Sequence, residues 1–159
     1  MYPATLDHLG LAVAVREYCA EFTRKEGIPV NYVHRGISAR LPGRTASTLY
    51  RIAEEALANV AKHAQANRAW VTLSRTTKVT RLTVRDDGAG FDPAALEPGS
   101  GLGILAMRER LRAVKGSLSI RSRPGAGTEV VTLAPLSSAG NQPRAAIPRN
   151  VVVDPLDQH

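Results

Sequence analysis

The stretch EEALANVAKHA, residues 54–64, places Glu55, Asn59, Lys62 and His63 in a run that otherwise has the pattern of a buried helix. The apolar residues of this run and its approach recur at spacings of three and four, as on the buried face of an α-helix: Leu49, Ile52, Ala53, Ala56, Leu57, Val60 and Ala64. At about 100° per residue, Glu55, Asn59 and His63 form a line that drifts toward the apolar face, and Lys62 completes a polar ridge beside it. An acid, an amide, an ammonium and an imidazole on one ridge suit a cation and a phosphate together. The same residues also occur on ordinary solvated helix edges, so this stretch alone leaves both readings open.

The segment DDGAG, residues 86–90, directly follows the strand pattern TRLTVR. Gly88 and Gly90 allow the backbone to turn sharply and to approach a ligand without a Cβ in the way. Asp86 stands at the end of the strand, where its carboxylate is suited to accept a hydrogen bond from an exocyclic amino group of a purine. The alternative is a simple Asp-Gly turn.

Two further glycine-rich segments follow along the chain. GSGLG, residues 99–103, leads into a helical pattern that begins near Ile104, and free N–H groups at a helix N-terminus form a ready phosphate cradle. No Gly-Lys-Ser/Thr follows, as a Walker loop requires, and no strand directly precedes it, as a dinucleotide fingerprint requires. GAGT, residues 125–128, closes a turn between two strand patterns, and its simplest interpretation is a hairpin.

Composition limits the class of protein. A chain of 159 residues with 43% hydrophobic residues is about one domain with a single core. Cys19 is the sole cysteine and falls in a helical pattern, so we expect it in the core of a cytoplasmic protein without disulfides. No segment approaches the roughly 18 to 20 apolar residues of a membrane span, so we expect no membrane contact by this chain. The net charge is +7, but arginines are spread along the chain and aromatic residues make up 4%, which favours a phosphorylated small molecule over nucleic acid.

Periodicity predicts the order of the elements. We expect a helix over residues 5–25, a short strand over 30–34, the helix that contains residues 54–64, a hairpin of strands over 70–75 and 80–85, a helix from residue 104, and two last strands, SLSIRS and TEVVTLA. Periodicity stops after Pro135, and residues 136–159 have the composition of a linker or tail.

The ordered set EALANVAKHA, VRDDGAGF, GSGLGILAMRERL and GSLSIRSRPGAGTEVVTL resembles the ATP-binding catalytic domain (HATPase_c) of bacterial sensor histidine kinases of the nitrate-sensor-like subfamily. This domain belongs to the superfamily that joins DNA gyrase, Hsp90, histidine kinases and MutL. The resemblance covers about residues 5–135. It implies an α/β (α+β) two-layer sandwich of the Bergerat type, with helices on one face of a mixed, mainly antiparallel sheet, and a short lid over residues 91–99.

The resemblance also implies roles for individual residues. Glu55 corresponds to the catalytic acid that helps activate the phosphoacceptor or orient a water, and Asn59 to the ligand of Mg²⁺. Lys62 and His63 fall where relatives contact phosphate oxygens, and Asp86 falls where they read the adenine amino group. The other residues that match nucleotide-binding positions are Gly88, Gly90, Gly101, Leu102, Gly103 and Thr128.

The implied function is transfer of the γ-phosphate of ATP, with Mg²⁺, to a histidine on a dimerisation helix, and from there to a response regulator. The sequence departs from the pattern in two ways: Asp87 stands where many relatives have Asn, and no phosphoacceptor helix is recognisable, since His8 lacks the acid-flanked context. We therefore expect residues 1–135 to be the catalytic domain, with residues 1–26 ending a helical connection to a dimerisation domain. Two alternatives stay open: a nucleotide-binding regulatory module without kinase activity, and an anti-sigma-factor-like serine kinase.

Overall fold

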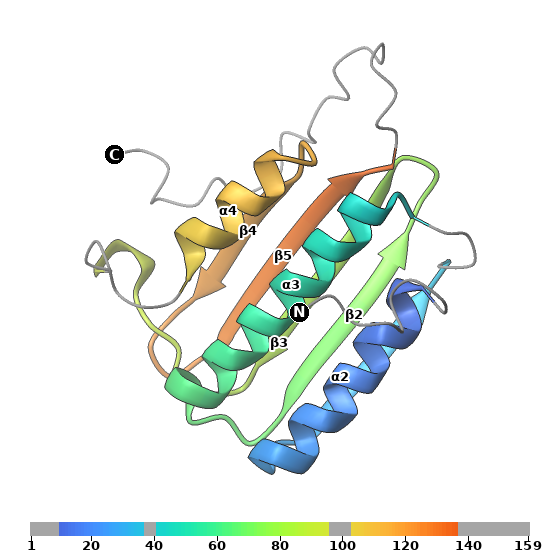
Figure 1. Ribbon diagram of the computed structural model, residues 1–159. Coiled ribbons are helices and arrows are strands. Elements are labelled where there is room, and N and C mark those ends of the chain that lie inside the picture. The colour runs from blue at the N-terminus through green and yellow to red at the C-terminus, as the bar shows by residue number, and fades with distance from the viewer. Residues whose placement is uncertain (1–9, 37–40, 96–102, 137–159) are drawn as a thin grey trace.

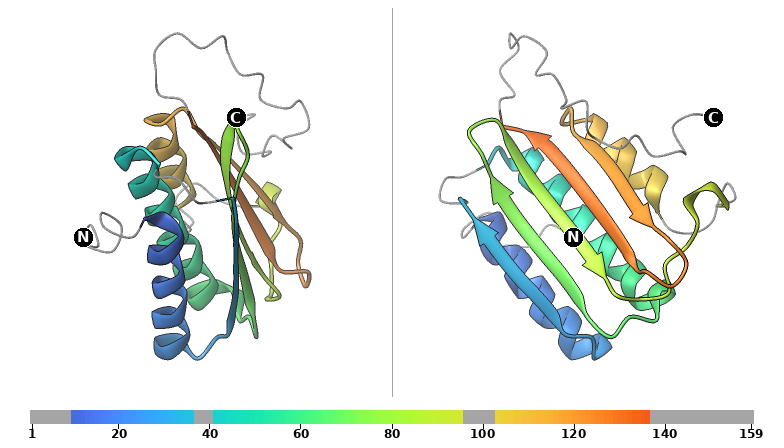
Figure 2. Two further views of the ribbon diagram at one scale, coloured as in Figure 1. Left: turned by 90° about the vertical axis from the view of Figure 1, so that its right-hand side faces the viewer. Right: turned by 180° about the vertical axis from the view of Figure 1, so that it is seen from behind.

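A five-stranded sheet and the helices on one of its faces make up the described part of the chain, which comprises residues 10–36, 41–95 and 103–136 of the computed structural model. The strands are β1 (Val30–Arg35), β2 (Ala69–Arg75), β3 (Val79–Asp86), β4 (Ser117–Ser122) and β5 (Thr128–Pro135). The helices are α2 (Leu11–Glu26), α3 (Gly43–Asn59) and α4 (Ile104–Arg112), with a π-helical turn η1 (Val60–Ala64) and a 3₁₀ turn η2 (Pro93–Ala95). The helices α2, α3 and α4 lie on the same side of the sheet, and none of the described helices lies on the opposite face (Figures 1 and 2).

The strand order across the sheet is β1-β2-β3-β5-β4. β1 and β2 pair in parallel through the crossover that contains α3, whereas the other three pairs are antiparallel. α3 lies against β3 and β5 in the middle of the sheet, with α2 on the side of β1 and α4 over β4 (Figure 1). The predicted two-layer fold with a mixed, mainly antiparallel sheet is confirmed.

Helix α2 buries one face against α3 and β1 and ends at Gly27, whose left-handed conformation (φ 74°) closes the last turn. Val15 is fully buried, and Cys19 is 4% exposed in the same core, as expected. Burial raises the pKa of the Cys19 thiol to about 12. The helix expected from residue 5 begins at Leu11 within the described residues; residues 1–9, and with them His8, lie outside these.

Helix α3 is the central element of the helical layer. Its apolar stripe is buried as predicted, with Leu49, Ile52 and Leu57 at 0% exposure. The expectation of a regular α-helix through residue 64 is wrong in the last turn, because the chain widens into η1 after Asn59. The Val60 N–H donates to the carbonyls of both Ala56 and Leu57. The regular α-helical hydrogen-bond pattern is therefore already disturbed at the residue where η1 begins.

The predicted hairpin and the last two strands are confirmed. All of β2 pairs with residues 80–86 of β3, and the Thr76 N–H donates to the Val79 carbonyl across the turn at 2.9 Å. β4 and β5 pair in antiparallel register, with Ser122 opposite Thr128 at the RPGAG turn.

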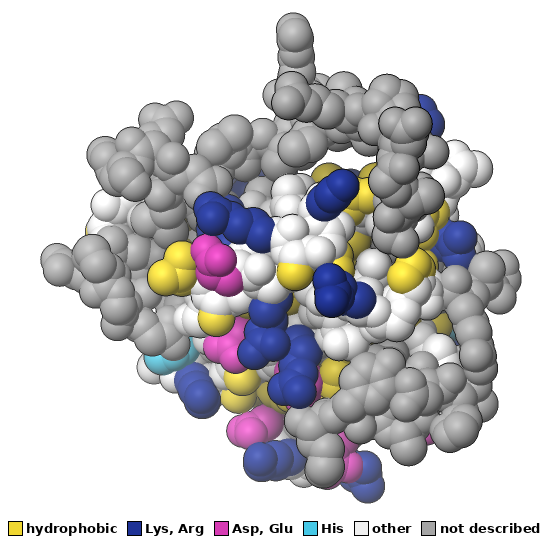
Figure 3. All heavy atoms as spheres, turned by 45° about the horizontal axis from the view of Figure 1, so that its top comes forward, with side chains coloured by type: hydrophobic (Ala, Val, Ile, Leu, Met, Phe, Trp, Pro, Cys, Tyr) yellow, Lys and Arg dark blue, Asp and Glu magenta, His cyan; other side chains and the backbone are white. Residues whose placement is uncertain are grey.

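Surface charge is spread out on the face that Figure 3 shows, where arginine and lysine side chains lie among acidic, polar and apolar ones. No helix in the described ranges is long and apolar enough to span a bilayer.

Candidate functional site

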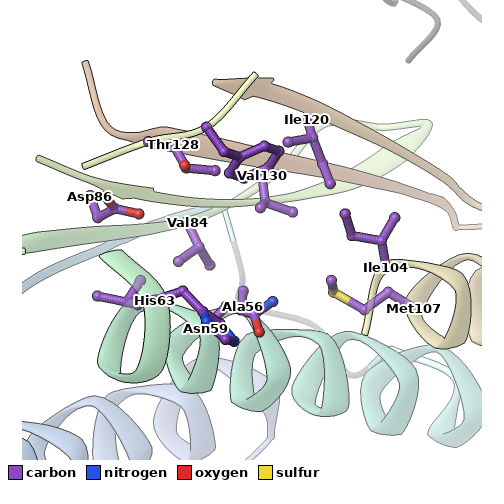
Figure 4. A pocket seen from close by; sticks show the side chains of 13 residues that line it. Ala56, Asn59, His63, Val84, Asp86, Ile104, Met107, Ile120, Thr128 and Val130 are labelled. Atoms are coloured by element: carbon purple, nitrogen blue, oxygen red, sulfur yellow. The ribbon is translucent and has the colours of Figure 1, made fainter. Parts of the chain in front are cut away.

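A pocket opens between the end of α3, the start of α4 and the helix-facing side of the sheet (Figure 4). It encloses about 510 Å³, its open mouth included. Its lining comprises Ala56, Asn59, Val60, His63, Val84, Asp86, Gly90, Phe91, Ile104, Met107, Ile120, Thr128 and Val130. Residues from four distant parts of the chain therefore share one cavity.

The sheet side of the pocket is formed by two rows of cross-strand partners. Val84, Val130 and Ile120 are direct neighbours across β3, β5 and β4 and form an apolar row. Asp86 and Thr128 are neighbours in the next row, at the ends of their strands. On the sheet side of the pocket, the hydrogen-bonding side chains therefore lie along one edge of the apolar row.

Asp86 is a buried carboxylate, 6% exposed, within this mainly apolar pocket. Its Oδ1 accepts a hydrogen bond from the Gly88 N–H at 2.8 Å, which the tight turn of DDGAG makes possible. Burial raises the pKa of Asp86 above its ordinary value, and this effect exceeds the opposing effect of the backbone N–H groups of Gly88 and Thr128. The carboxylate is held in place by short local contacts and its burial favours a partner that donates.

Glycines at the pocket edge allow close backbone contacts. Gly127 has φ 72°, and a Cβ on it would overlap the carbonyl oxygen of Asp86. Gly90 has φ 61°, and a Cβ there would overlap the carbonyl oxygen of Arg123. The GAGT turn and the DDGAG turn therefore pack backbone against backbone.

Glu55 lies beside the pocket, not in its lining. A Cβ on Gly103, which has φ 68°, would overlap the Glu55 carboxylate, so this acid rests directly on the glycine that precedes α4. Ile104, the next residue, lines the pocket. The contact places the acid of α3 where the GSGLG loop enters α4.

The structure brings together most of the predicted site residues that it describes. Asn59 and His63 lie across one pocket from Asp86 and Thr128 (Figure 4), and Gly90 belongs to the same lining. A second group adjoins the pocket without lining it, and comprises Gly88, Glu55 and Gly103.

The remaining predicted residues are not part of this cavity. Lys62 is exposed on η1 and does not line the pocket, because the wider turn shifts the residues after Asn59. Gly101 and Leu102, and residues 96–99 of the predicted lid, lie outside the described residues. Asp87 also turns away: its Oδ1 accepts from the N–H groups of Asn67 and Arg68 at 2.9 and 3.0 Å, in the loop before β2.

The sequence-based interpretation missed two groups of residues. One is the apolar lining, of which Met107 is 1% exposed and was assigned only to a helix. The other is Ser122, a buried hydroxyl beside Thr128. Strand alternation contained a signal for it, since Ser122 is the polar member of the inward-facing series Leu118, Ile120, Ser122.

Comparison with known proteins identifies this arrangement. The sequence pattern of the family described as "Histidine kinase-, DNA gyrase B-, and HSP90-like ATPase" matches residues 45–138. The chain belongs to this ATPase family. The match contains the Asn59 and Asp86 walls of the pocket, so the pocket lies in the ATP-binding domain that defines the family.

Relatives of this ATPase domain are sensor kinases. The chain is 34% identical over 133 residues, 84% of its length, to "Signal transduction histidine-protein kinase/phosphatase DegS" of Brevibacillus brevis. It is 37% identical over 136 residues, 85% of its length, to "Oxygen sensor histidine kinase NreB" of Staphylococcus carnosus. These matches cover 34% and 39% of the two relatives, so the chain spans little more than a third of their length.

The fold agrees with a solved structure as well. The histidine kinase domain of the blue-light activated histidine kinase from Erythrobacter litoralis superimposes with a TM-score of 0.60 at 23% identity, over 79% of this chain and 61% of that one. The predicted resemblance to histidine kinase ATPase domains is confirmed.

Proposed function

We propose that this chain is the ATP-binding catalytic domain of a two-component sensor histidine kinase, a phosphotransferase that moves the γ-phosphate of ATP to a histidine on a dimerisation helix. The observation that carries the proposal is the meeting of Asn59 and Asp86 on opposite walls of one pocket in an ATPase domain. The wall that contains Asp86 suits the adenine base, and the wall that contains Asn59 suits the phosphates and their metal ion.

The adenine ring occupies the apolar row of Val84, Val130 and Ile120 in this proposal. Burial of a flat aromatic ring there removes apolar surface from water on both sides of the cavity. Asp86 accepts a hydrogen bond from the exocyclic amino group. A buried acceptor increases the affinity for a ligand that donates a hydrogen bond to it and decreases the affinity for a ligand that does not.

Asn59 supplies a side-chain oxygen that suits Mg²⁺. In the described ranges, no group of three His, Cys, Asp or Glu side chains is placed to hold a metal ion by itself. A single amide oxygen fits a hard cation whose other ligands are phosphate oxygens and waters. The bound ion would neutralise phosphate charge during transfer.

Phosphate positioning falls to the residues at the junction of η1 and α4. His63 lies next to Asn59 in the pocket wall, and Gly103, against which the Glu55 carboxylate rests, directly precedes α4. Lys62, exposed on η1, is free of the pocket wall and would contact phosphate oxygens from the solvent side. We extend this proposal to Gly101 and Leu102 as part of the same loop.

Glu55 is the proposed catalytic residue. Its carboxylate lies against Gly103, where the loop enters α4. This position is beside the pocket and away from the proposed adenine site. From there it would accept a proton from the phosphoacceptor imidazole as the Nε2 or Nδ1 atom attacks phosphorus. Glu55→Gln keeps the shape and removes the proton acceptor.

The partners follow from this role. They are a helical dimerisation domain that carries the phosphoacceptor histidine, and a response regulator that receives the phosphoryl group. We propose that α2 ends the connection to that helical domain, that residues 1–135 form the catalytic domain with 136–159 as a tail, and that the domain works in the cytoplasm.

Acid lability tests the proposal. The chain would be incubated with γ-labelled ATP, Mg²⁺ and a separate dimerisation helix from a related kinase, with Glu55→Gln as the matched control. We expect label on the helix that is lost in acid, and at least about a hundredfold less with the variant at unchanged ATP affinity.

Two other outcomes correspond to the alternatives. Acid-stable label on serine would replace the histidine kinase by a serine kinase. ATP binding without transfer to any helix offered would favour a regulatory nucleotide-binding module.

A further inference from the structure

A row of three polar side chains crosses the sheet at the edge of the pocket. Asp86, Thr128 and Ser122 are successive cross-strand partners on β3, β5 and β4. All three side chains belong to the helix-facing series of their strands. Asp86 and Thr128 line the pocket, and Ser122 stands behind them at 9% exposure.

The Ser122 hydroxyl makes three hydrogen bonds. The Phe91 N–H lies 2.8 Å from its Oγ, the Gly127 carbonyl oxygen 3.1 Å and the Thr128 Oγ1 2.8 Å. A backbone N–H only donates and a carbonyl only accepts, whereas a serine hydroxyl has one proton to give. Ser122 therefore donates to Gly127 and accepts from Phe91.

This accounting fixes the direction of the remaining bond. Because the proton of Ser122 is given to Gly127, the bond between Ser122 and Thr128 has to use the proton of Thr128. The Thr128 oxygen then has only lone pairs left for a ligand. Together with Asp86, it presents an edge of acceptors to the pocket.

We propose that Ser122 is a positioning residue that points the Thr128 proton away from the pocket, and so makes the site select a purine with an amino group at position 6 over one with a carbonyl there. The inference rests on the proposed function, because it takes the pocket ligand to be a purine nucleotide. Ser122 acts through Thr128 and does not touch the ligand itself.

ATP and inosine triphosphate probe this selection, because they share the sugar and the phosphates. Their bases differ at position 6, an amino donor in adenine and a carbonyl acceptor in hypoxanthine, and at the adjacent N1, which is an acceptor in adenine and carries a hydrogen in hypoxanthine. Their affinities for the full chain would be measured by calorimetry with Mg²⁺. We expect the unsubstituted chain to prefer ATP by at least about tenfold.

Ser122→Ala removes the acceptor of the Thr128 hydroxyl, which can then donate a hydrogen bond to a 6-carbonyl of the ligand. We expect the preference for ATP over inosine triphosphate to fall by about threefold or more. Ser119→Ala is the matched control: Ser119 is 8% exposed on the same strand, and we expect its substitution to leave the preference unchanged. A merely structural role of Ser122 would weaken both nucleotides equally, and an unchanged ratio would overturn the inference.

Thr128→Val provides a second, nearly isosteric variant if Ser122→Ala folds poorly. It removes the acceptor, and we expect the same narrowing of the ratio; an unchanged ratio here would also overturn the inference. Equal binding of both nucleotides by the unsubstituted chain would do so as well. If that chain bound neither nucleotide, the proposed function itself would fall, and the inference with it.

Discussion

Asp86 lowers the stability of the nucleotide-free domain and, in our proposal, strengthens nucleotide binding. Its pKa is raised, mainly by burial, so folding favours the neutral form of the carboxyl. The ionised side chain is therefore a destabilising element above that raised pKa. Below the ordinary value of 3.8, where the group is neutral in folded and unfolded chains alike, the cost disappears.

Asp86→Asn tests this sign. An amide oxygen still accepts from the Gly88 N–H and carries no charge, so we expect the nucleotide-free variant to melt a few degrees higher than the unsubstituted chain at pH 7, the shift that about 1 kcal/mol produces in a chain of this size. The difference is expected to close as the pH falls toward 3.8. Thermal melts over a pH series give the answer, and a variant that melts lower at every pH would show that burial of the charge is not the dominant cost.

Asp87, the adjacent residue, behaves in the opposite way. Its pKa is lowered, first by the backbone N–H of Arg68 and also by that of Asn67. A lowered pKa means that the contribution to stability is present above pH 3.8 and is lost as the pH falls from there through the lowered value.

We expect Asp87→Ala to lower the melting temperature at pH 7 and to have little effect in acid. Asp87→Asn is the matched control, because its amide oxygen still accepts from both N–H groups. Melting curves at the two pH values check this. The contribution linked to the lowered pKa belongs to the charged carboxylate, so we expect Asp87→Asn also to melt lower at pH 7, but by less than Asp87→Ala because it keeps both hydrogen bonds. An unchanged melting temperature for Asp87→Asn would contradict a contribution from the charge.

At the scale of elements, the pocket depends on how the two turns after β3 and β4 meet. Gly125 and Gly127 both have positive φ, at 80° and 72°, but a Cβ on Gly125 would meet nothing within 4 Å, whereas one on Gly127 would overlap the Asp86 carbonyl. Substitutions at the two glycines therefore distinguish the backbone strain of a positive φ from the effect of the close contact between the GAGT turn and the end of β3.

We expect Gly125→Ala to cost about 1 to 2 kcal/mol of unfolding free energy, the strain of a positive φ alone. Gly127→Ala adds overpacking against a backbone that cannot rotate away, so its loss should reach about 3 kcal/mol, with weaker ATP binding. Urea denaturation of both variants measures the difference. Similar losses would contradict the close contact between the GAGT turn and Asp86.

Patterns within single segments predicted the helices and strands, but they did not predict which distant strands pair with each other. The stripe from Leu49 to Leu57 and the β2–β3 hairpin depend on periodicity and a short turn, which are properties of one segment. The row of Asp86, Thr128 and Ser122 depends on β5 pairing with β3, and nothing in either segment encodes that choice. The widened turn η1 was not predicted, because a π-helical turn is rare and a single one inside an α-helix does not stand out in the spacing of the apolar residues.

The candidate site shows the same division. The glycine segments and the polar ridge were recognisable as an ordered set, which placed Asn59 and Asp86 in one proposed site. The contact of Glu55 with Gly103 and the departure of Lys62 from the pocket are tertiary features. They follow from how α4 packs on α3 and from the geometry of η1.

At the scale of the whole molecule, one core joins the pocket to the opposite end of the helical layer. Cys19 on α2 belongs to the same cluster of buried residues as Val84 and Met107 of the pocket. Burial raises the pKa of its thiol to about 12, so the folded chain presents almost no thiolate at neutral pH.

Cys19 labelling therefore reports opening of the core. If opening is global, a ligand at 100 times its dissociation constant should slow labelling about a hundredfold. The measurement is the rate of reaction with a thiol reagent at pH 7, with and without ATP and Mg²⁺. A rate that ATP leaves unchanged would show that α2 opens independently of the pocket.

The central claim is that the pocket between α3, α4 and the sheet binds ATP through Asp86. Calorimetric titration of ATP with Mg²⁺ into the full chain and into Asp86→Asn tests it most directly. We predict saturable binding by the unsubstituted chain with one nucleotide per chain, and a loss of at least about tenfold in affinity for the variant, since a buried acceptor is replaced by a group that also donates. Equal affinity of the two chains would contradict the account.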